Sequence, residues 1–370
     1  MTSLCEIEIE IKNKTSNSDN LQDKEDKFEI KEIMNTLPWI EKYRPSTLDQ
    51  ILSHTEIIST LKTFIKNRCL PHLLFYGPPG SGKTSTITAA AKELYGKYFP
   101  YMVMELNASD DRGIEVVRNK IKQFVMSKNV FFGETVEDRK NIFKLVILDE
   151  TDAMTRDAQA ILRKIVEKYT DNTRFCLICN YIQNINPALQ SRCTRFRFSP
   201  INKNQIKEKI LEITEKENIK ITQQGIDTII RRSNGDMRKV INIIQSTSMT
   251  YPVVNEKNIN SCLGYPSRQH MDIVMNNLLN NSFSKAYTNL VNLKTENGLS
   301  LGDIITELHE ILVNLIVSEE ASEYTKKLKL NNIINILDKL RTIEYNHSVN
   351  TIENIQFGGL VGIFKTNLHK

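Results

Sequence analysis

The stretch Gly77-Pro78-Pro79-Gly80-Ser81-Gly82-Lys83-Thr84 matches the phosphate-binding pattern G-x-x-x-x-G-K-[ST]. In this pattern the glycines let the backbone turn its N–H groups towards phosphate oxygens. Lys83 is then expected to meet the β and γ phosphates, and the Thr84 hydroxyl to bind Mg²⁺. A turn with an incidental lysine would not explain all of the constrained positions together. The stretch therefore predicts a site for a nucleoside triphosphate.

The residues on both sides of this loop support the prediction. A short apolar run, residues 73–76, comes before it, and an alanine-rich segment, residues 85–95, follows it. We expect a buried strand before the loop and a helix after it, whose N-terminal dipole faces the anion. Ser85 then joins the loop residues as a candidate nucleotide contact.

Two adjacent carboxylates, Asp149 and Glu150, follow a later apolar run, residues 145–148. At the tip of a buried strand, Asp149 is suited to hold the water shell of Mg²⁺, and Glu150 to orient and deprotonate an attacking water. The alternative is that these acidic residues cap the next helix. It suits Asp152 well and the Asp149-Glu150 pair poorly.

Three further polar residues are candidates for the same chemistry. Asn180 ends an apolar run, residues 175–179, where it could hydrogen-bond the γ-phosphate or the water. Arg192 lies in Ser191-Arg192-Cys193, and Arg238 lies where a helix of a later segment begins. An arginine that stabilises the transferred phosphoryl group comes from the same chain or from a neighbour.

Length and composition indicate an intracellular protein of two or three domains. The chain has 370 residues, 40% of them hydrophobic, and a net charge of +5. We expect no membrane span and no secretory signal, because apolar runs are short and the N-terminus is acidic. Cys5, Cys69 and Cys262 are isolated. Strand alternation should place Cys176 and Cys179 on opposite faces, so we expect core thiols and not a metal pair.

The pattern along the chain divides it into four parts. Residues 1–36, with nine acidic residues against five Lys, predict a flexible acidic extension, so the rest of the chain is more basic than the whole. Residues 37–200 alternate apolar runs (73–76, 101–106, 145–148, 175–179) with helical periods, which predicts an α/β parallel-sheet domain. Residues 201–263 predict three helical segments. Residues 264–370 predict a helical domain with two apolar stripes: Leu301, Ile304, Ile305, Leu308, Ile311, Leu312 and Leu315, and then Ile333, Ile334, Leu337 and Leu340.

Six blocks of sequence resemble the AAA+ ATPases, and more narrowly the small subunits of replication factor C, the eukaryotic sliding-clamp loader. They stand in the family's order: WIEKYRP (39–45), FYGPPGSGKTST (75–86), ELNASDDRG (105–113), LDETDAMT (148–155), ICNY (178–181) and SRCTRFRF (191–198). The resemblance implies an AAA+ P-loop domain at 37–200, a helical lid domain at 201–263 and a helical collar domain at 264–370. The collar would join five subunits into a hetero-pentameric ring.

The resemblance also implies roles for single residues. Lys83 and Thr84 would serve ATP and Mg²⁺, with Asp149 and Glu150 for metal and water activation. Asn180 would be the first sensor, Arg238 the second, and Arg192 an arginine finger that reaches the ATP site of the adjacent subunit. Tyr43, Arg44 and Pro45 would line the adenine pocket. The family's usual Asp-Glu-Ala-Asp box carries Thr151 here, for which we expect a slight effect.

Basic residues on two helices suggest contacts with the DNA backbone if such a ring lines its inner surface with them. They are Arg112, Arg118, Lys122, Arg156 and Arg163. Arginines and helix N-termini suit phosphate oxygens, so such contacts would follow the duplex without distinguishing bases. The alternative is a solvated helix face on which Glu115 pairs with Arg118.

Three functions compete. The resemblance favours a nuclear ring subunit that uses ATP binding to open a sliding clamp and seat it on primer-template DNA, with hydrolysis releasing the loader. An ATP-driven DNA-remodelling motor would share the nucleotide residues, although the blocks around Arg112 and Arg192 argue against it. A largely structural subunit that binds nucleotide and turns over little stays open, because neighbours supply arginines to such sites.

Overall fold

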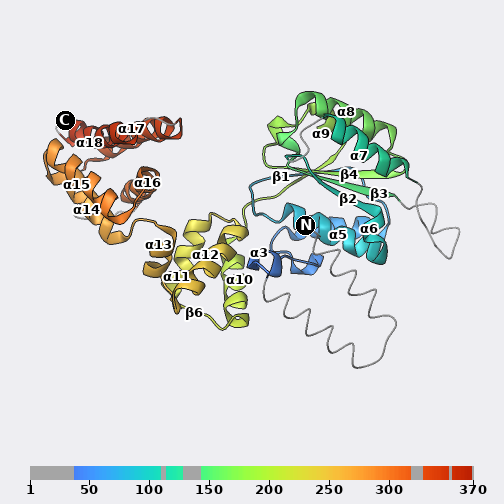
Figure 1. Cartoon of the computed structure of the whole chain (residues 1–370), viewed down its shortest axis with the longest axis horizontal. Coiled ribbons are helices and arrows are strands. Elements are labelled where there is room, and N and C mark those ends of the chain that lie inside the picture. Colours follow the sequence, from blue (N-terminus) through green and yellow to red (C-terminus); the bar gives the residue numbers. More distant parts are fainter. Residues whose placement is uncertain (1–36, 110–113, 128–142, 318–327, 350–351, 369–370) are drawn as a thin grey trace. The chain divides into compact units, whose positions relative to one another are not determined.

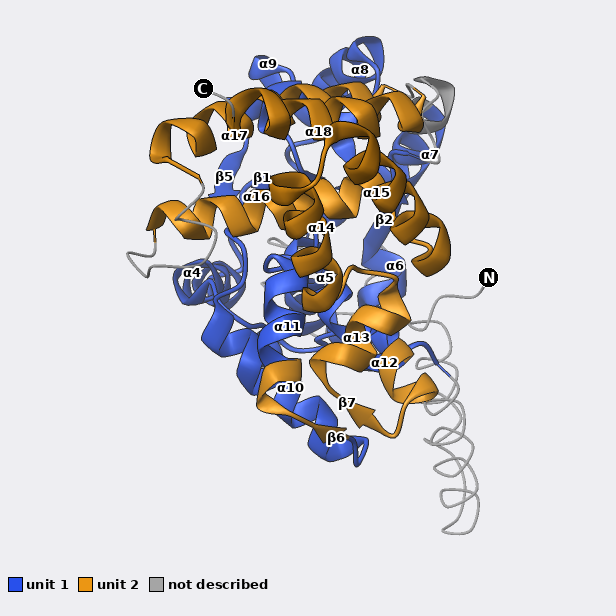
Figure 2. Cartoon of the chain, turned by 90° about the vertical axis from the view of Figure 1, so that its left-hand side faces the viewer, with its two compact units in different colours: residues 1–219, 226–245 blue, residues 220–225, 246–370 orange. Residues whose placement is uncertain are grey.

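The computed structural model describes residues 37–109, 114–127, 143–317, 328–349 and 352–368. The chain divides into two compact units, one of residues 1–219 and 226–245 (unit 1) and one of residues 220–225 and 246–370 (unit 2) (Figure 2). Residues 201–263 contribute to both units.

A five-stranded parallel sheet forms the centre of unit 1, as the sequence predicts. The strands are β1 (Leu73–Tyr76), β2 (Val103–Asn107), β3 (Lys144–Asp149), β4 (Thr173–Cys179) and β5 (Thr194–Arg197), in the order β2-β3-β4-β1-β5. Strands covered on both faces are almost continuously apolar, which is why β1, β3 and β4 are visible in the sequence. The edge strand β5 is mostly exposed, has Phe196 as its one apolar residue, and was not predicted.

Helices cover both faces of this sheet (Figure 1). One face carries α7 (Ile114–Met126), α8 (Arg156–Lys168) and α9 (Pro187–Gln190), and the other carries α4 (Thr55–Lys66) and α5 (Lys83–Tyr95). Cys176 and Cys179 belong to the hydrophobic cores on opposite faces, which confirms the alternation expected for β4. Helix α5 begins at Lys83, two residues earlier than predicted.

Short elements complete the sheet region. They are α3 (Trp39–Lys42), η1 (Leu48–Gln50), η2 (Gly96–Tyr98), α6 (Phe99–Met102), η3 (Thr151–Ala153) and η4 (Ile182–Asn184). The predicted strand at 101–106 is wrong at its start, because Tyr101 and Met102 belong to α6 and the strand begins at Val103. Pro100 in the first turn of α6 favours this helical turn.

Residues 201–263 form more elements than the three predicted helices. The helices are α10 (Lys203–Lys216), α11 (Gln223–Ser233), α12 (Met237–Thr250) and α13 (Glu256–Leu263), and a parallel ladder pairs β6 (Lys220–Ile221) with β7 (Val253–Val254). Each strand of the ladder has two residues, which is too short to produce a periodic signal in the sequence.

Helices make up the rest of unit 2: α14 (Arg268–Asn280), α15 (Phe283–Asn297), α16 (Leu301–Val317), α17 (Leu330–Ser348) and α18 (Glu353–Leu368). The stripe predicted on α16 packs in their shared core. On α17 the stripe is wrong at Ile334, which is 51% exposed, whereas Ile336 and Ile343 are buried. In the described part of the chain, no helix is both long and apolar enough to cross a membrane.

Candidate nucleotide site

The loop between β1 and α5 requires glycine at defined positions. Gly80 and Gly82 have φ angles of 65° and 94°, in the left-handed region that favours glycine. At Gly80 a Cβ atom would lie 1.7 Å from Oδ1 of Asp236, and at Gly77 it would lie 2.1 Å from the Phe198 carbonyl oxygen. Backbone conformation and close packing therefore both select glycine, and the chain reaches the N-terminus of α5 in a tight turn.

Lys83, the first residue of α5, has a buried side chain that is held inside the loop. Its ammonium group donates to the carbonyl oxygens of Gly77 and Pro78, each at 2.8 Å, and to Oδ1 of Asn180 at 3.0 Å. Burial lowers the pKa of Lys83, and the nearby Asp149 carboxylate opposes this shift. The lysine thus brings the loop together with the end of β4.

Thr84 and Asp149 meet at the carboxyl edge of the sheet. The Thr84 hydroxyl donates to Oδ2 of Asp149 at 2.6 Å, and the other carboxylate oxygen accepts from the Glu150 backbone N–H at 2.8 Å. A hydroxyl and a carboxylate this close match the oxygen donors that Mg²⁺ prefers. Magnesium needs few protein ligands where substrate phosphates and water supply the others, so these two residues fit the ion.

The three residues that follow Asp149 differ in burial and in their contacts. Glu150 is exposed and has a φ of 53°, an uncommon conformation for a residue other than glycine and one that clusters at functional sites. Thr151 is buried, and its hydroxyl donates to the Leu148 carbonyl oxygen at 2.9 Å. Asp152 accepts from the backbone N–H groups of Asn180 and Tyr181, both at 3.1 Å. Thr151 therefore leaves the carboxylates undisturbed, and Asp152 fixes the end of β4.

These residues open into a pocket of about 410 Å³ within unit 1. It is lined by Ile40, Glu41, Tyr43, Arg44, Pro45, Gln50, Ile51, Leu52, Pro79, Gly80, Ser81, Gly82, Lys83, Thr84, Ser85, Asp149, Glu150, Asn180, Ile201, Lys209, Met237, Arg238 and Ile241. The structure thus brings together the residues predicted to bind phosphate and Mg²⁺, to act as the catalytic base, to line the adenine pocket and to serve as the two sensors. Gly77 and Pro78 stand behind them, where their carbonyl groups hold Lys83.

The segment that contributes Tyr43, Arg44 and Pro45 to the pocket is tied to the end of α10. Glu217, just after α10, accepts from Lys42 at 2.6 Å and from the Tyr43 hydroxyl. Burial and the bond to Glu217 raise the pKa of Tyr43, so the phenol stays protonated. Burial opposes ionisation of Glu217, but its two donors prevail and lower its pKa. Sequence reasoning missed Glu217, since its partners lie far away in the chain.

Arg238 reaches the pocket from the first turn of α12. Asp236 accepts from the backbone N–H of Arg238 at 2.9 Å, and the Met237 N–H donates to the Gly80 carbonyl oxygen at 3.3 Å. The Arg238 charge contributes to lowering the pKa of Lys83, after burial. The start of α12 is therefore joined directly to the phosphate loop.

Comparisons with known proteins agree with this geometry. Residues 73–201 match the AAA model (ATPase family associated with various cellular activities), residues 203–258 the RFC1-like AAA+ ATPase lid domain, and residues 266–362 the replication factor C C-terminal domain. The chain is 47% identical over 330 residues to replication factor C subunit 5 of Mus musculus, covering 89% of this chain and 92% of that protein. The chain belongs to the replication factor C family of AAA ATPases.

More distant members of the replication factor C family match over nearly the same span. Replication factor C subunit 3 of Saccharomyces cerevisiae is 41% identical, covering 90% of this chain and 94% of that protein. The solved structure of the Thermotoga maritima RuvB Holliday junction branch migration motor shares 14% identity with a TM-score of 0.47, covering 70% of this chain and 88% of that one. That second likeness is too weak to bear on function.

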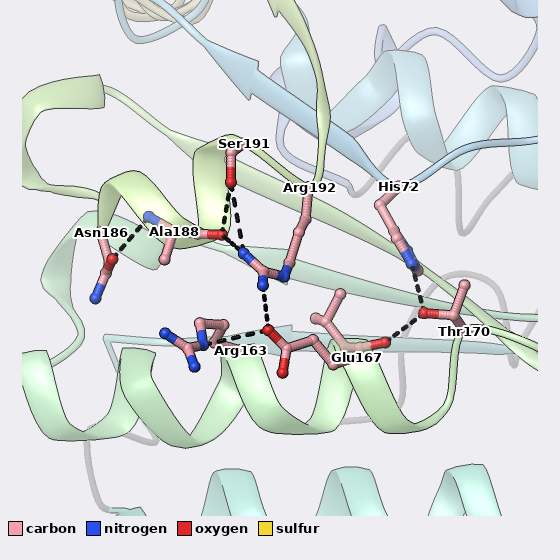
Figure 3. A network of polar contacts seen from close by, with 9 residues as sticks. His72, Arg163, Glu167, Thr170, Asn186, Ala188, Ser191 and Arg192 are labelled. Atoms are coloured by element: carbon pink, nitrogen blue, oxygen red, sulfur yellow. Dashed lines mark hydrogen bonds and ion pairs between the residues drawn. The ribbon is translucent and has the colours of Figure 1, made fainter.

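Arg192 lies outside this pocket. Its guanidinium donates through Nη1 to the Ala188 carbonyl oxygen at 2.6 Å and pairs through Nη2 with Oε1 of Glu167 at 2.5 Å (Figure 3). Arg163 of α8 also approaches Glu167, with its Nε 3.3 Å from the same oxygen. Arg192 therefore faces the last turn of α8, on the surface of this replication factor C family member.

The residues predicted to contact DNA differ in exposure, and some of them lie outside the described residues. Arg112 lies outside the described residues, and Arg118 lies on α7, with a side chain that is also outside them. Lys122 on α7 and Arg156 at the start of α8 are exposed. Arg163 is half-buried and pairs with Glu167. Lys122 and Arg156 are thus the described members of this group that present exposed side chains.

Proposed function

We propose that this chain is an ATP-hydrolysing subunit of a hetero-pentameric clamp loader, which opens a sliding clamp and seats it on primer-template DNA in the nucleus. One observation carries the proposal. The chain assembles a pocket with the residues needed to bind a nucleotide, while Arg192 projects elsewhere on unit 1. In ATP sites of this design, the arginine that stabilises the transferred phosphoryl group comes from the same chain or from a neighbour. Because Arg192 lies outside its own pocket, it is available to the site of a neighbouring subunit, as in a ring.

The pocket residues take the following roles. Lys83 and the N–H groups of the loop bind the phosphates of ATP, and Tyr43, Arg44 and Pro45 contact the base. Thr84 and Asp149 hold Mg²⁺, which when bound neutralises charge on the phosphates. Glu150 accepts the proton of the attacking water. Asn180, already bonded to Lys83, orients the water or the terminal phosphate, and Arg238 reports the phosphates to α12.

The domain division belongs to the same proposal. Residues 37–200 bind nucleotide, residues 201–263 form a lid, and residues 264–370 form a collar that joins the ring, with residues 1–36 as an extension ahead of them. DNA contacts come from the basic residues of α7, α8 and the segment before α7. Their character, phosphate-directed and indifferent to sequence, suits a clamp loader that acts wherever a primer ends.

The deciding experiment is ATP hydrolysis by the reconstituted ring with and without clamp and primer-template DNA. Stimulation that needs both ligands together supports a clamp loader. Stimulation by DNA alone, accompanied by strand or junction movement, supports a remodelling motor instead. If Lys83→Ala in this chain leaves the stimulated rate unchanged, the site is structural and the assignment of hydrolysis to this subunit is wrong.

A further inference from the structure

One carboxylate at the end of α8 holds two arginines. Oε1 of Glu167 lies 2.5 Å from Nη2 of Arg192 and 3.3 Å from Nε of Arg163 (Figure 3). Arg163 and Glu167 are four residues apart on one helix face, whereas Arg192 arrives from the turn that follows α9. Glu167 is therefore shared between a helical neighbour and an arginine from another element.

The contacts of Arg192 fix the orientation of its guanidinium group. Nη2 is bound by Glu167 of α8, and Nη1 donates to the carbonyl oxygen of Ala188 in α9 at 2.6 Å. Two nitrogens of a planar group bound by two different elements fix the plane of that group. The three side chains are 36–41% exposed, so the ion pairs contribute little to stability. The main effect of these contacts is on the direction in which the Arg192 guanidinium points.

The end of α8 that carries Glu167 is itself braced. The Thr170 hydroxyl donates to the Val166 carbonyl oxygen at 2.6 Å, and Nε2 of His72, just before β1, lies 3.3 Å from the same hydroxyl. Figure 3 shows these contacts continuing from the last turn of α8 to His72. Glu167 thus stands on a helix end that is tied to the sheet, which is what a group that positions another residue requires.

We propose that Glu167 is a positioning residue for the arginine finger: it holds the Arg192 guanidinium in the orientation in which a neighbouring subunit's ATP receives it. This inference rests on the proposed role of Arg192 in the ring. A long arginine side chain that points freely into solvent must lose its rotamer freedom in each catalytic cycle, whereas one held in advance has already lost it. Glu167 does not touch ATP and takes no part in the chemistry.

The test uses an assembled ring in which every ATP site is hydrolysis-defective, this chain's own site included, except the neighbouring subunit's site that receives Arg192, so that turnover comes from that site alone. This chain carries Glu167→Ala, Glu167→Gln, Arg192→Ala, or Glu167→Ala with Arg192→Ala. We expect Glu167→Ala to lower kcat about tenfold with little change in the KM for ATP. Glu167→Gln keeps an acceptor oxygen and should stay within about threefold of the parent. The double variant should be no slower than Arg192→Ala alone.

Asp171→Ala is the matched control, because it removes an exposed carboxylate near the same helix end. Its kcat should equal that of the parent ring. If Glu167→Ala does not assemble, Glu167→Asp carries the test: it keeps the charge but withdraws the oxygen from Arg192, and kcat should still fall.

The outcomes separate this inference from the proposed function. If Arg192→Ala leaves hydrolysis unchanged, the ring role of Arg192 is wrong and the inference falls with it. If Arg192→Ala slows hydrolysis while the Glu167 variants do not, the positioning role is wrong and the ring role stands. Faster hydrolysis in Glu167→Ala would also overturn the inference, because it would mean that Glu167 restrains the finger.

Discussion

The nucleotide pocket and the surface around Arg192 are built in opposite ways. In the pocket, the ends of β3 and β4, the loop after β1 and the start of α12 converge, and Lys83 is buried among carbonyl oxygens. Around Arg192 the polar groups are partly exposed, and the guanidinium is held by the Glu167 carboxylate, the Ala188 carbonyl oxygen and the Ser191 hydroxyl. The first region is equipped to bind a ligand by itself, whereas the second presents a single group outwards.

The two regions should respond differently to mutation. Removing a buried polar group leaves its partners unsatisfied, which costs more than removing a solvated one. Changes in the pocket should therefore abolish ATP binding or hydrolysis at this site. Changes around Arg192 should only reduce the rate of hydrolysis at a neighbouring site.

Lys83→Ala should remove productive ATP binding, with an affinity loss of at least about 100-fold, because several charge-assisted contacts to phosphate disappear together. Affinity is measured by titration with a fluorescent ATP analogue. The exposed Lys97 supplies a control of equal charge, since Lys97→Ala should bind as the parent does. The fold should persist by circular dichroism. Near-normal affinity in Lys83→Ala would show that the loop does not hold the phosphates.

Glu150→Gln should keep ATP affinity and slow hydrolysis by at least about 100-fold, because an amide cannot accept the proton of the attacking water. Single-turnover hydrolysis in the assembled ring measures the chemical step directly. Asp157→Asn, an exposed carboxylate in the first turn of α8, is the control. Unchanged turnover at this site would mean that Glu150 is not the base and that the pocket depends on another residue for water activation.

The sequence predicts much of the pocket for a physical reason. Strands β1, β3 and β4 are neighbours in a parallel sheet, and the carboxyl ends of parallel strands meet at one edge. A continuous apolar run that ends in a polar residue therefore predicts both the strand and its contribution to the site. Asp149 and Asn180 follow from this pattern and Lys83 from the glycine-rich motif after β1, and the structure places the three together.

The parts that the sequence does not predict depend on packing between distant segments. Glu217 meets Tyr43 across 174 residues, and nothing local to either residue indicates the pairing. Glu167 looks like an ordinary partner of Arg163 on a helix face, and its contact with Arg192 arises from the turn after α9. Sequence periodicity reports which face is buried, and it carries no information on which two exposed groups are brought together.

Glu217→Ala should weaken ATP binding about fivefold, which corresponds to about 1 kcal/mol. The reason is that the segment around Tyr43, which lines the pocket, loses its contacts with Glu217. Trp39, the single tryptophan of the chain, lies 6.1 Å from Tyr43 between ring centroids, so its fluorescence should report the change. Glu215→Ala, which removes an exposed carboxylate from the same helix, should leave both readouts unchanged. Equal affinities for the two variants would mean that the anchor does not shape the pocket.

The smallest effect on ATP binding is expected from His72, whose Nε2 lies 3.3 Å from the Thr170 hydroxyl, just beyond the end of α8 that carries Glu167. Its Nδ1 accepts from the Phe175 backbone N–H at 3.2 Å, a bond that requires the neutral ring. Burial, together with the Arg174 charge, lowers the pKa of His72 to about 4. Because the folded-state pKa lies below the ordinary value of about 6.5, the stabilisation is complete above that pH. It is lost progressively as the pH falls from about 6.5 to 4.

Urea unfolding measured across this pH range should therefore show a steeper loss of stability in the parent chain than in His72→Gln, which has no titrating ring. We expect the difference to reach at most about 3 kcal/mol at pH 4. ATP affinity of the two chains should fall in parallel over the same range, because His72 braces α8 and not the pocket. Identical pH slopes of stability would mean that His72 does not carry the brace. A selective loss of ATP affinity in His72→Gln would mean that the two regions are not separate.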